Sequence, residues 1–405
     1  MHILLLNHYA GSPDHGMEYR PYYLAREWGR QGHRVQIIAS SESHLRLRNP
    51  TVNTPTAVET INGIEYCWIR TSPYEGNGVR RLINMAQFTA RVYGMATALA
   101  ASRPDIVIAS STYPYDIVAA RRIARKAKAR LVYEIHDLWP LTPQLLGNFP
   151  SWHPMIASMQ WAENYAYRHA DKVISILPGT ESHARAHGMA PGKFAHVPNG
   201  FDPTNQPSIL PTAVCERIEA FSQAFRATCI YTGGHAVSNA LDPLLAAAGK
   251  PACAGIGIIL VGKGVEKARL QAYADQHALH NVLFVDPVEK SAIPSILKLA
   301  DFAYLGWQDS PLYAHGMSPN KLFDYMMAGL PVVHSTSSPF DLVRDAHCGI
   351  SVPAEDSDAI AQALAQMAQL SPGQRHALGT AGQAYVYAHH PYPRLAEQFL
   401  QALDT

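Results

Sequence analysis

The sequence predicts an α/β fold of two domains, each a parallel sheet with helices on both faces. At 405 residues the chain exceeds what one hydrophobic core usually supports, so two domains of about 150 to 200 residues are expected. In both halves, short apolar strands alternate with helix-length segments, a pattern typical of parallel sheets. The segment 203–211 is rich in Pro, Asn, Gln and Ser, and we place the domain junction there.

The first domain is expected to begin with a strand, helix and strand unit. An apolar strand at Ile3–Leu6 precedes a loop with Gly, Pro and Asp, then a helix near Glu18–Gln31 and a strand at Val35–Ala39. The pattern returns where strands Ile106–Ala109 and Leu131–Ile135 flank a basic helix. Such repetition predicts a doubly wound sheet.

The second domain is expected to repeat this alternation from residue 229 onward. The predicted elements are strand Cys229–Thr232, helix Ala240–Ala248, strand Gly257–Val261, helix Val265–His277, strand Val282–Val285, helix Ala292–Lys298 and strand Phe302–Leu305. Ligands of open parallel sheets bind outside the carboxyl ends of the strands. The loops after these strands should therefore form the walls of a cleft between the two domains.

Charge is unevenly divided along the chain. The first 200 residues carry 21 Lys and Arg against 14 Asp and Glu, whereas the remainder carries 12 against 18. A basic first half suggests an anionic partner such as a membrane surface, a phosphorylated lipid or a nucleic acid. A solvated surface with chance asymmetry would give the same counts.

The composition is that of an ordinary globular protein, with 47% hydrophobic residues. The N-terminus lacks the basic start and apolar stretch of a secretory signal, and the longest apolar run, Ala252–Gly262, is too short to span a bilayer. Five scattered cysteines suggest neither disulfides nor zinc and fit a reducing cytosol. We find no pair of histidines at metal-binding spacing beside a third ligand, so no catalytic metal is expected.

One helix start places a lysine where lysines are usually disfavoured. In SPNKLFDYMMAGLPVV, Ser318 is expected to cap a helix that begins at Pro319. The backbone N–H groups of Asn320 and Lys321 would then be unpaired at the positive end of the helix dipole. A lysine there indicates an anionic partner such as a phosphate, and Asp324, one turn on, is placed to accept hydrogen bonds from sugar hydroxyls. An incidental surface lysine and a solvated aspartate are the alternative.

Two glycine loops follow strands of the second domain. Gly233, Gly234 and His235 come directly after the first strand, and Gly262 comes directly after the second, so backbone can approach a ligand there. The second loop begins a G-x-G-x-x-G pattern, but Lys267 occupies its last place, which disfavours nicotinamide chemistry. Turns without a ligand would look the same.

Two loops of the first domain also offer polar side chains at strand ends. His136 and Asp137, in YEIHDLWP, should project into the cleft, where a histidine can hydrogen-bond a substrate hydroxyl or phosphate. The loop after the first strand offers Gly16, Glu18 and Arg20 at a helix start. A core histidine satisfied by Asp137, and a plain loop, are the alternatives.

An amphipathic helix is expected in the first domain. Apolar positions recur at three- and four-residue steps from Leu82 to Leu99, on a helix opened by Arg80 and Arg81 and carrying Arg91. This pattern fits a basic surface for a membrane interface. A helix that covers a core would look the same.

Taken together in order, these motifs resemble family 4 of the retaining glycosyltransferases, which have the GT-B architecture of two doubly wound Rossmann-like domains facing each other across a cleft. The resemblance covers nearly the whole chain and includes LAREWGRQGHRV, EIHDLWP, VPNGFD, YTGGHAVSNALDPLLAAA, LVGKGVEKARL and SPNKLFDYMMAGLPVV. EIHDLWP with SPNKLFDYMMAGLPVV is similar to the branch that includes N-acetyl-L-fucosamine transferases of bacterial O-antigen and capsule synthesis.

The resemblance implies transfer of a sugar, an N-acetylated amino sugar in that branch, from a UDP-sugar donor to an undecaprenyl-diphosphate-linked saccharide. Anomeric configuration is retained, and neither a metal nor another cofactor is required. The enzyme would be cytoplasmic and peripheral to the inner face of the cytoplasmic membrane, with no nucleic acid as partner. Residues 1–202 would bind the acceptor, residues 203–384 would bind the nucleotide-sugar, and a helix in 385–405 would pack back on the first domain.

The resemblance also implies residue roles. His136, which would contact the donor sugar, and Lys321 are the expected catalytic residues. The donor site would comprise Gly233, Gly234, His235, Gly262, Ser318, Asn320, Lys321 and Asp324, with Ser318, Asn320 and Lys321 on the diphosphate and Asp324 on the ribose. The acceptor site would comprise Gly16, Glu18, Arg20 and Asp137.

The sequence departs from the family pattern in two places. Of two acids that normally stand eight residues apart, the first is replaced by Gly316 and the second is Asp324. The usual Arg and Lys after the first glycine loop are missing from GGHAVSNALD, so Lys321 would neutralise more of the phosphate charge than usual. A UDP-sugar 2-epimerase of the same architecture and a non-catalytic saccharide- or membrane-binding subunit remain alternative functions.

Overall fold

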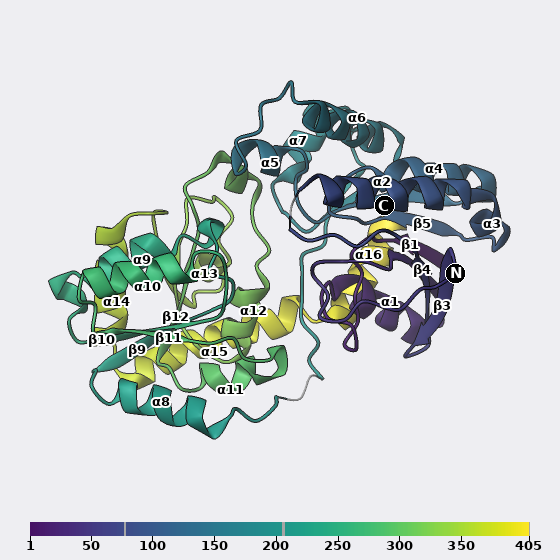
Figure 1. The fold of residues 1–405 in the computed structure, drawn as a ribbon. Helices are drawn as coiled ribbons and strands as arrows, with labels where there is room; N and C mark the ends of the chain where they lie inside the picture. The colour runs from purple at the N-terminus through teal and green to yellow at the C-terminus, as the bar shows by residue number, and fades with distance from the viewer. Residues whose placement is uncertain (77, 205–206, 405) are drawn as a thin grey trace. The chain divides into compact units, whose positions relative to one another are not determined.

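The computed structural model describes residues 1–76, 78–204 and 207–404, which form two compact units (Figure 1). Unit 1 comprises Met1–Gly200 together with the tail that begins at Tyr392, and unit 2 comprises Phe201–Pro391. The chain thus first passes from unit 1 to unit 2 beside the expected boundary at residue 202. Both units are α/β, as the sequence predicts, and each has a sheet of its own.

The sheet of unit 1 has eight strands in the order β3-β4-β2-β1-β5-β6-β7-β8. All neighbours are parallel except β3 and β4, which form an antiparallel hairpin at the edge. The central strand β1 is buried along its whole length because it has a strand on each side and helices above and below. The strands are β1 His2–Leu6, β2 Arg34–Ser40, β3 Thr56–Ile61, β4 Ile64–Ile69, β5 Ile106–Ala109, β6 Arg130–Ile135, β7 Lys172–Ser175 and β8 Phe194–His196.

Helices cover both faces of this sheet. On one face α1 and the C-terminal α16 pack together over β1, β2 and β4. The indole N–H of Trp28 in α1 donates to the carbonyl of Ala396 in α16 at 3.0 Å. On the other face α2 packs on α4, and α4 packs on β5 and β6. The helices are α1 Arg20–Arg30, α2 Val79–Gly94, α3 Ala96–Ala101, α4 Asp116–Ala127, α5 Leu141–Leu145, α6 Pro154–His169, α7 Thr180–Ala186 and α16 Tyr392–Asp404.

The sheet of unit 2 has six parallel strands in the order β11-β10-β9-β12-β13-β14. The three central strands β10, β9 and β12 are buried along their whole length, which explains their largely apolar sequences. The strands are β9 Ala227–Thr232, β10 Ile256–Val261, β11 Val282–Val285, β12 Phe302–Gly306, β13 Val332–Ser335 and β14 Gly349–Val352.

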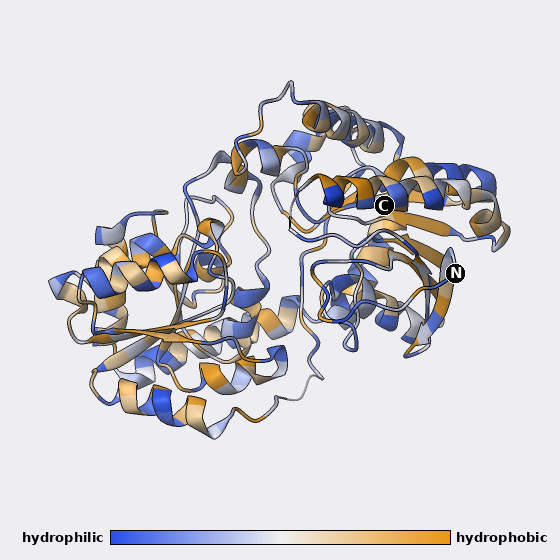
Figure 2. Cartoon of the chain, in the orientation of Figure 1, coloured by the Kyte–Doolittle hydropathy of each residue, from blue (hydrophilic) through white to orange (hydrophobic). Residues whose placement is uncertain are grey.

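Two hydrophobic clusters lie on the two faces of this sheet. Helices α9, α10 and α14 contribute to one cluster, and α8, α11, α12 and α15 contribute to the other. Figure 2 shows the hydrophobic strands between helices whose outer faces are largely hydrophilic. The helices are α8 Thr212–Ser222, α9 Leu241–Ala248, α10 Lys267–Gln276, α11 Ile293–Leu297, α12 Asn320–Met327, α13 Leu342–Asp345, α14 Ser357–Gln369 and α15 Pro372–His389.

Several helix boundaries differ from the expected ones. The amphipathic helix expected from residue 80 to 99 is divided at Met95 into α2 and α3. The final segment 385–405 contains the end of α15 and then α16, which begins only at Tyr392. In the part of the chain that the structure describes, no helix is long and apolar enough to cross a membrane.

Candidate functional site

Helix α12 begins one residue later than the sequence suggested. Pro319 has extended backbone with ψ 120° and is the N-cap, so the helix starts at Asn320, and Ser318 is not its cap. The expectation for Ser318 was therefore wrong by one position. The helix start still presents Asn320 and Lys321 at its positive end, and Asn320 is exposed there.

Lys321 is partly buried beside two aromatic rings. Its ammonium donates to the side-chain carbonyl of Asn239 and lies 5.2 Å from the ring centre of Tyr231 and 5.9 Å from that of Trp307. Among the residues that the structure describes, no carboxylate lies within ion-pair distance of it. Burial lowers the pKa of Lys321 to about 8. A cation held in this way is ready to receive an anion.

The two glycine loops pack backbone against backbone beside Lys321. A Cβ on Gly233 would lie 2.5 Å from Cε of Lys321, and a Cβ on Gly262 would lie 1.9 Å from the carbonyl oxygen of Gly233. Both glycines have positive φ, 145° and 149° respectively. Gly234 accepts hydrogen bonds through its carbonyl from Tyr231 and Asn239, at 2.7 and 2.9 Å. Only glycine therefore fits at these two positions, where the loops pack against each other and against Lys321.

His235 is fully buried, and both of its ring nitrogens lack a hydrogen-bond partner. Burial, followed by the positive charges of Lys267 and Lys321, lowers its pKa to about 4, so the ring is neutral near pH 7. An unsatisfied buried nitrogen costs about 1 to 3 kcal/mol, which a ligand or water can recover. The buried ring therefore marks a position where a polar ligand group would be stabilised.

Asp324 lies one turn after Lys321, but its carboxylate is already engaged by the ammonium of Lys290. Burial raises the pKa of Asp324, and Lys290 opposes that shift. The side chain of Lys290 is more than half exposed, so this partner can leave when another donor arrives. Lys267, at the start of α10, donates to the carbonyls of Gly262 and Val285 at 3.0 and 3.3 Å and so secures the second loop.

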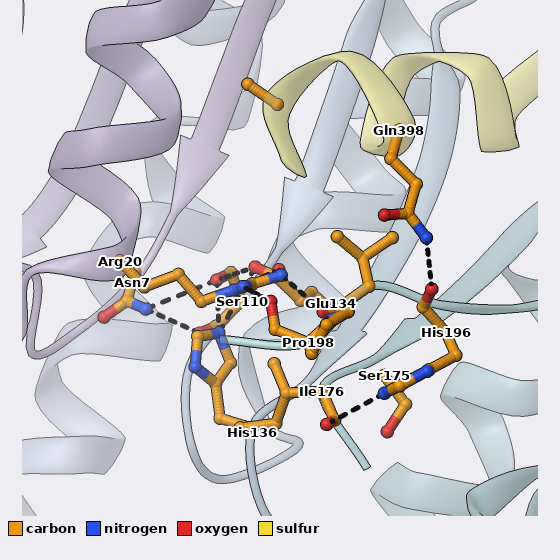
Figure 3. Close-up of polar contacts among 12 residues, drawn as sticks. Asn7, Arg20, Ser110, Glu134, His136, Ser175, Ile176, His196, Pro198 and Gln398 are labelled. Atoms are coloured by element: carbon orange, nitrogen blue, oxygen red, sulfur yellow. Dashed lines mark hydrogen bonds and ion pairs between the residues drawn. The ribbon is translucent and has the colours of Figure 1, made fainter. Parts of the chain in front are cut away.

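In unit 1 a buried network of charges surrounds His136 (Figure 3). Its Nδ1 lies 3.2 Å from the carboxylate of Glu18, and its Nε2 lies 3.2 Å from that of Glu134 and 2.9 Å from Oγ of Ser110. Burial opposes the charged ring, but the two carboxylates outweigh it and raise the pKa of His136 to about 10. The ring is thus a cation, and both nitrogens are already bonded.

Arg20 completes this network from the start of α1. It is buried, and its guanidinium pairs with Glu134 at 2.9 Å and donates to the carbonyls of Val197 and Pro198. Burial alone would raise the pKa of Glu134, but Arg20 and then His136 lower it to about 2. Because every arm of Arg20 is used inside the fold, it positions Glu134 and is not free for an acceptor.

Asp137 and Gly16 have structural partners as well. The carboxylate of Asp137 accepts hydrogen bonds from the backbone of Leu138 and the side chains of Trp139 and Thr142, at 2.7 to 3.0 Å, so it does not satisfy His136. Gly16 has φ 98° and forms two isolated β-bridges, one to a residue of its own loop and one to a residue of a neighbouring loop. Both residues shape the loops at the carboxyl edge of the sheet.

Comparison with known proteins decides the family. A model described as "Glycosyl transferase 4-like domain" matches residues 15–200, and one described as "Glycosyl transferases group 1" matches residues 226–369. The chain belongs to the glycosyltransferases. The expected family is thereby confirmed at this level, whereas its N-acetyl-L-fucosamine branch stays a prediction. No curated protein matches the sequence of this glycosyltransferase.

Solved structures confirm the GT-B fold of this glycosyltransferase. Sucrose-phosphate synthase from Thermosynechococcus elongatus superposes with a TM-score of 0.74 at 16% identity, over 99% of this chain and 97% of the other. Anabaena HepE in complex with UDP-glucose gives 0.66 at 16%, over 100% and 99%. WaaG, a glycosyltransferase involved in lipopolysaccharide biosynthesis, gives 0.66 at 16%, also over 100% and 99%.

The glycosyltransferase contains site residues that the sequence analysis missed. Asn239 and Tyr231 surround Lys321, and Glu134 pairs with His136. Glu134 could have been found, because residues two apart on a strand point to the same face. Asn239 gave no such signal, since its role depends on a contact between residues 82 positions apart.

The expectation about histidine spacing also needs correction. His183 in α7 and His187 at its C-cap are four residues apart, and Glu163 of α6 lies beside them. Their ligand atoms all lie within 4.8 Å of one another. The sequence analysis overlooked this pair because its third member comes from another helix.

Proposed function

We propose that this glycosyltransferase transfers a sugar, an N-acetylated amino sugar, from a UDP-sugar to a lipid-linked saccharide with retention of anomeric configuration. The observation that best supports the proposal is Lys321, a partly buried ammonium at a helix start with no carboxylate partner among the described residues. A diphosphate would supply the missing negative charge. A charge-assisted hydrogen bond to it contributes about 1.5 to 3 kcal/mol.

The same residues would assist the chemistry as well as binding. Breaking the bond between sugar and diphosphate leaves negative charge on the departing phosphate. The first N–H groups of α12 and the ammonium of Lys321 are held in place before this charge develops, so they need little reorganisation to stabilise it. The retained configuration fits an acceptor hydroxyl that attacks the face the diphosphate leaves, with a phosphate oxygen accepting its proton.

Solved structures of similar fold that contain UDP ligands support a uridine nucleotide as the donor. HepE has been solved with UDP and with UDP-glucose, and the Escherichia coli trehalose-6-phosphate protein, with a TM-score of 0.69 at 12% identity, with UDP-2-fluoro glucose. These ligands belong to those proteins. In this chain the glycine loops and the unsatisfied ring of His235 are where we place the nucleotide.

A lipid-linked acceptor is supported by a groove on unit 1. The groove has a volume of about 870 Å³ and lies between α2, the start of α4 and α6, with apolar side chains and the exposed rings of Tyr93 and Trp161 along it. At the start of α2, the guanidinium of Arg81 lies over the rings of Tyr9 and Trp139, which follow β1 and β6. Arg122 lies over Tyr93, 4.2 Å from its centre.

We place the apolar chain of the acceptor in this groove and its diphosphate beside the arginines of α2. The contacts of Arg81 are consistent with such a molecule, because Arg81 precedes Leu82 of the groove and lies over Tyr9 and Trp139, which follow the carboxyl ends of β1 and β6. An undecaprenyl-diphosphate-linked saccharide, used in O-antigen or capsule synthesis at the inner face of the cytoplasmic membrane, has this chemistry. Aromatic rings and arginines at the rim also suit a membrane interface.

A chain-length comparison tests the acceptor. Ala90 is exposed in the groove, so Ala90→Trp would fill the space without disturbing the core. Activity should fall for acceptors with a long isoprenoid chain and stay unchanged for the same saccharide on a short chain. Replacing the exposed Tyr387 of unit 2 by Ser is the matched control. Equal loss on both acceptors would contradict the groove's role.

A product assay tests the reaction itself. The enzyme is incubated with UDP-N-acetylhexosamines, with and without a lipid-linked saccharide, and NMR follows both UDP release and the configuration at the new linkage. We expect UDP release that depends on the acceptor, and a retained anomer. An epimer formed without acceptor would instead identify a UDP-sugar 2-epimerase. An inverted linkage would refute retention.

A further inference from the structure

The cluster of Glu163, His183 and His187 has no role in sugar transfer as derived above. It lies in unit 1, where α6 supplies the carboxylate and α7 with its C-cap supplies both imidazoles. We propose that these three side chains form a binding site for Zn²⁺ that joins α6 to α7. Two histidines and one glutamate, with a water in the fourth position, are an established ligand set for this ion.

The distances already approach those of a zinc site. Nε2 of His183 lies 2.9 Å from a carboxylate oxygen of Glu163. Ligand atoms about 2.0 Å from a tetrahedral ion are about 3.3 Å apart, so these two atoms need to separate by only a few tenths of an ångström. The third ligand atom, from His187, lies within 4.8 Å of both. To bind the ion through Nε2, the neutral ring of His183 would carry its proton on Nδ1, and the ion would occupy the place of the hydrogen between Nε2 and Glu163.

His187 is held in the tautomer that a metal requires. Its Nδ1 lies 2.9 Å from the backbone carbonyl of His183 and must donate a hydrogen there, since a carbonyl can only accept. In the neutral ring the lone pair then lies on Nε2. Hydrogen bonds of this kind from the second ring nitrogen orient metal-binding histidines in known sites. His187 is also only partly buried, which leaves an entry path for the ion.

Glu163 is fixed in a comparable way. It is buried, and its oxygens accept hydrogen bonds from the hydroxyl of Tyr167 at 2.9 Å and the amide of Gln160 at 2.8 Å. Tyr167 is itself fully buried in the same helix, so the carboxylate has little freedom to turn away. The ligand least able to move is therefore anchored in the core, and the more accessible imidazoles close on the ion.

Calorimetric titration of the full chain with ZnCl₂, after removal of metals with EDTA, tests the site. We expect one equivalent to bind. His187→Ala should weaken this event by at least about tenfold, and Tyr167→Phe, which removes only a hydrogen bond to the ligand, by about tenfold. His277→Ala is the matched control, because His277 also ends a helix and bonds the carbonyl four residues earlier, but belongs to no group of potential metal ligands among the described residues.

A second measurement separates a specific site from general binding to the chain's many histidines. Co²⁺ bound in place of Zn²⁺ should give the absorption bands of a four-coordinate ion in the wild type and not in His187→Ala. The melting temperature should rise with Zn²⁺ in the wild type and in His277→Ala only. Absence of stoichiometric binding, or equal affinity in His187→Ala and the wild type, would overturn the proposal.

Discussion

The affinity for UDP should fall as pH rises from 7 to 9, because the ammonium of Lys321 loses its proton in this range. Burial lowers the pKa of Lys321 to about 8. About nine in ten molecules then carry the charge at pH 7, and about one in ten at pH 9. If the diphosphate binds only the charged form, affinity at pH 9 should be roughly tenfold weaker, equivalent to about 1.4 kcal/mol.

Other titratable groups beside Lys321 do not change their protonation between pH 7 and 9. His235 has its pKa lowered to about 4 and is neutral throughout. Burial raises the pKa of Tyr231, whose ring lies beside the ammonium of Lys321, well above its ordinary value, so this hydroxyl keeps its proton. Between pH 7 and 9, Lys321 is thus the group whose charge changes most among Lys321, His235 and Tyr231.

Isothermal titration calorimetry with UDP at pH 7, 8 and 9 measures the effect. Lys321→Met should bind UDP more weakly than the wild type at pH 7, and its affinity should lack the pH dependence that comes from the ammonium of Lys321. Any pH dependence that arises from the titration of UDP itself persists in both proteins. Lys298→Met, which removes an exposed lysine of the same unit, should behave as the wild type. A pH slope that is the same in Lys321→Met and the wild type would refute the reasoning.

Three further predictions concern stability and loop geometry. Without ligand, Lys321→Met should raise the free energy of unfolding at pH 7 by up to about 3 kcal/mol in urea titrations, because the folded-state pKa of Lys321 lies below its ordinary value of 10.5. The wild type should gain stability between pH 8 and 10.5 and the variant should not; parallel pH profiles would contradict this. Glu134→Gln should cost about 3 to 5 kcal/mol by the same assay, since Arg20 and His136 would keep buried charges without a counterion. Gly264→Ala should abolish UDP binding while circular dichroism stays native, because its Cβ would lie 2.1 Å from the carbonyl of His235; wild-type affinity would show that the loop can yield.

The strands were readable from the sequence because burial on both faces leaves long apolar runs. Strands β9, β10 and β12 of unit 2 were placed to within two residues at each end. The hairpin of β3 and β4 was missed, although Asn62 and Gly63, with φ 49° and 82°, form the two-residue turn that an Asn-Gly pair favours. Its antiparallel pairing lies at the sheet edge, where the apolar pattern is weakest.

The candidate site was readable only in part. Lys321 was conspicuous because a lysine at a helix start opposes the dipole. The interpretation of Arg20 as an acceptor ligand overlooked that a buried guanidinium must have its partners inside the fold. Asn239 and Glu163 depend on neighbours that the folded chain supplies from other elements. Such pairs can be recognised only in the tertiary structure, because no regular spacing along the sequence relates their members.

Because α16 belongs to unit 1, it limits how the two units can be exchanged between related enzymes. Because the chain enters unit 2 after Gly200 and leaves it before Tyr392, unit 1 is built from two separated stretches. The ring of Tyr392 stacks on that of Tyr23, and Phe399 packs against Trp28. A chimera that exchanged everything after residue 200 would therefore bring a foreign tail into the core of unit 1. Exchanging unit 2 between relatives calls for an insert of residues 201–391, with both native ends kept.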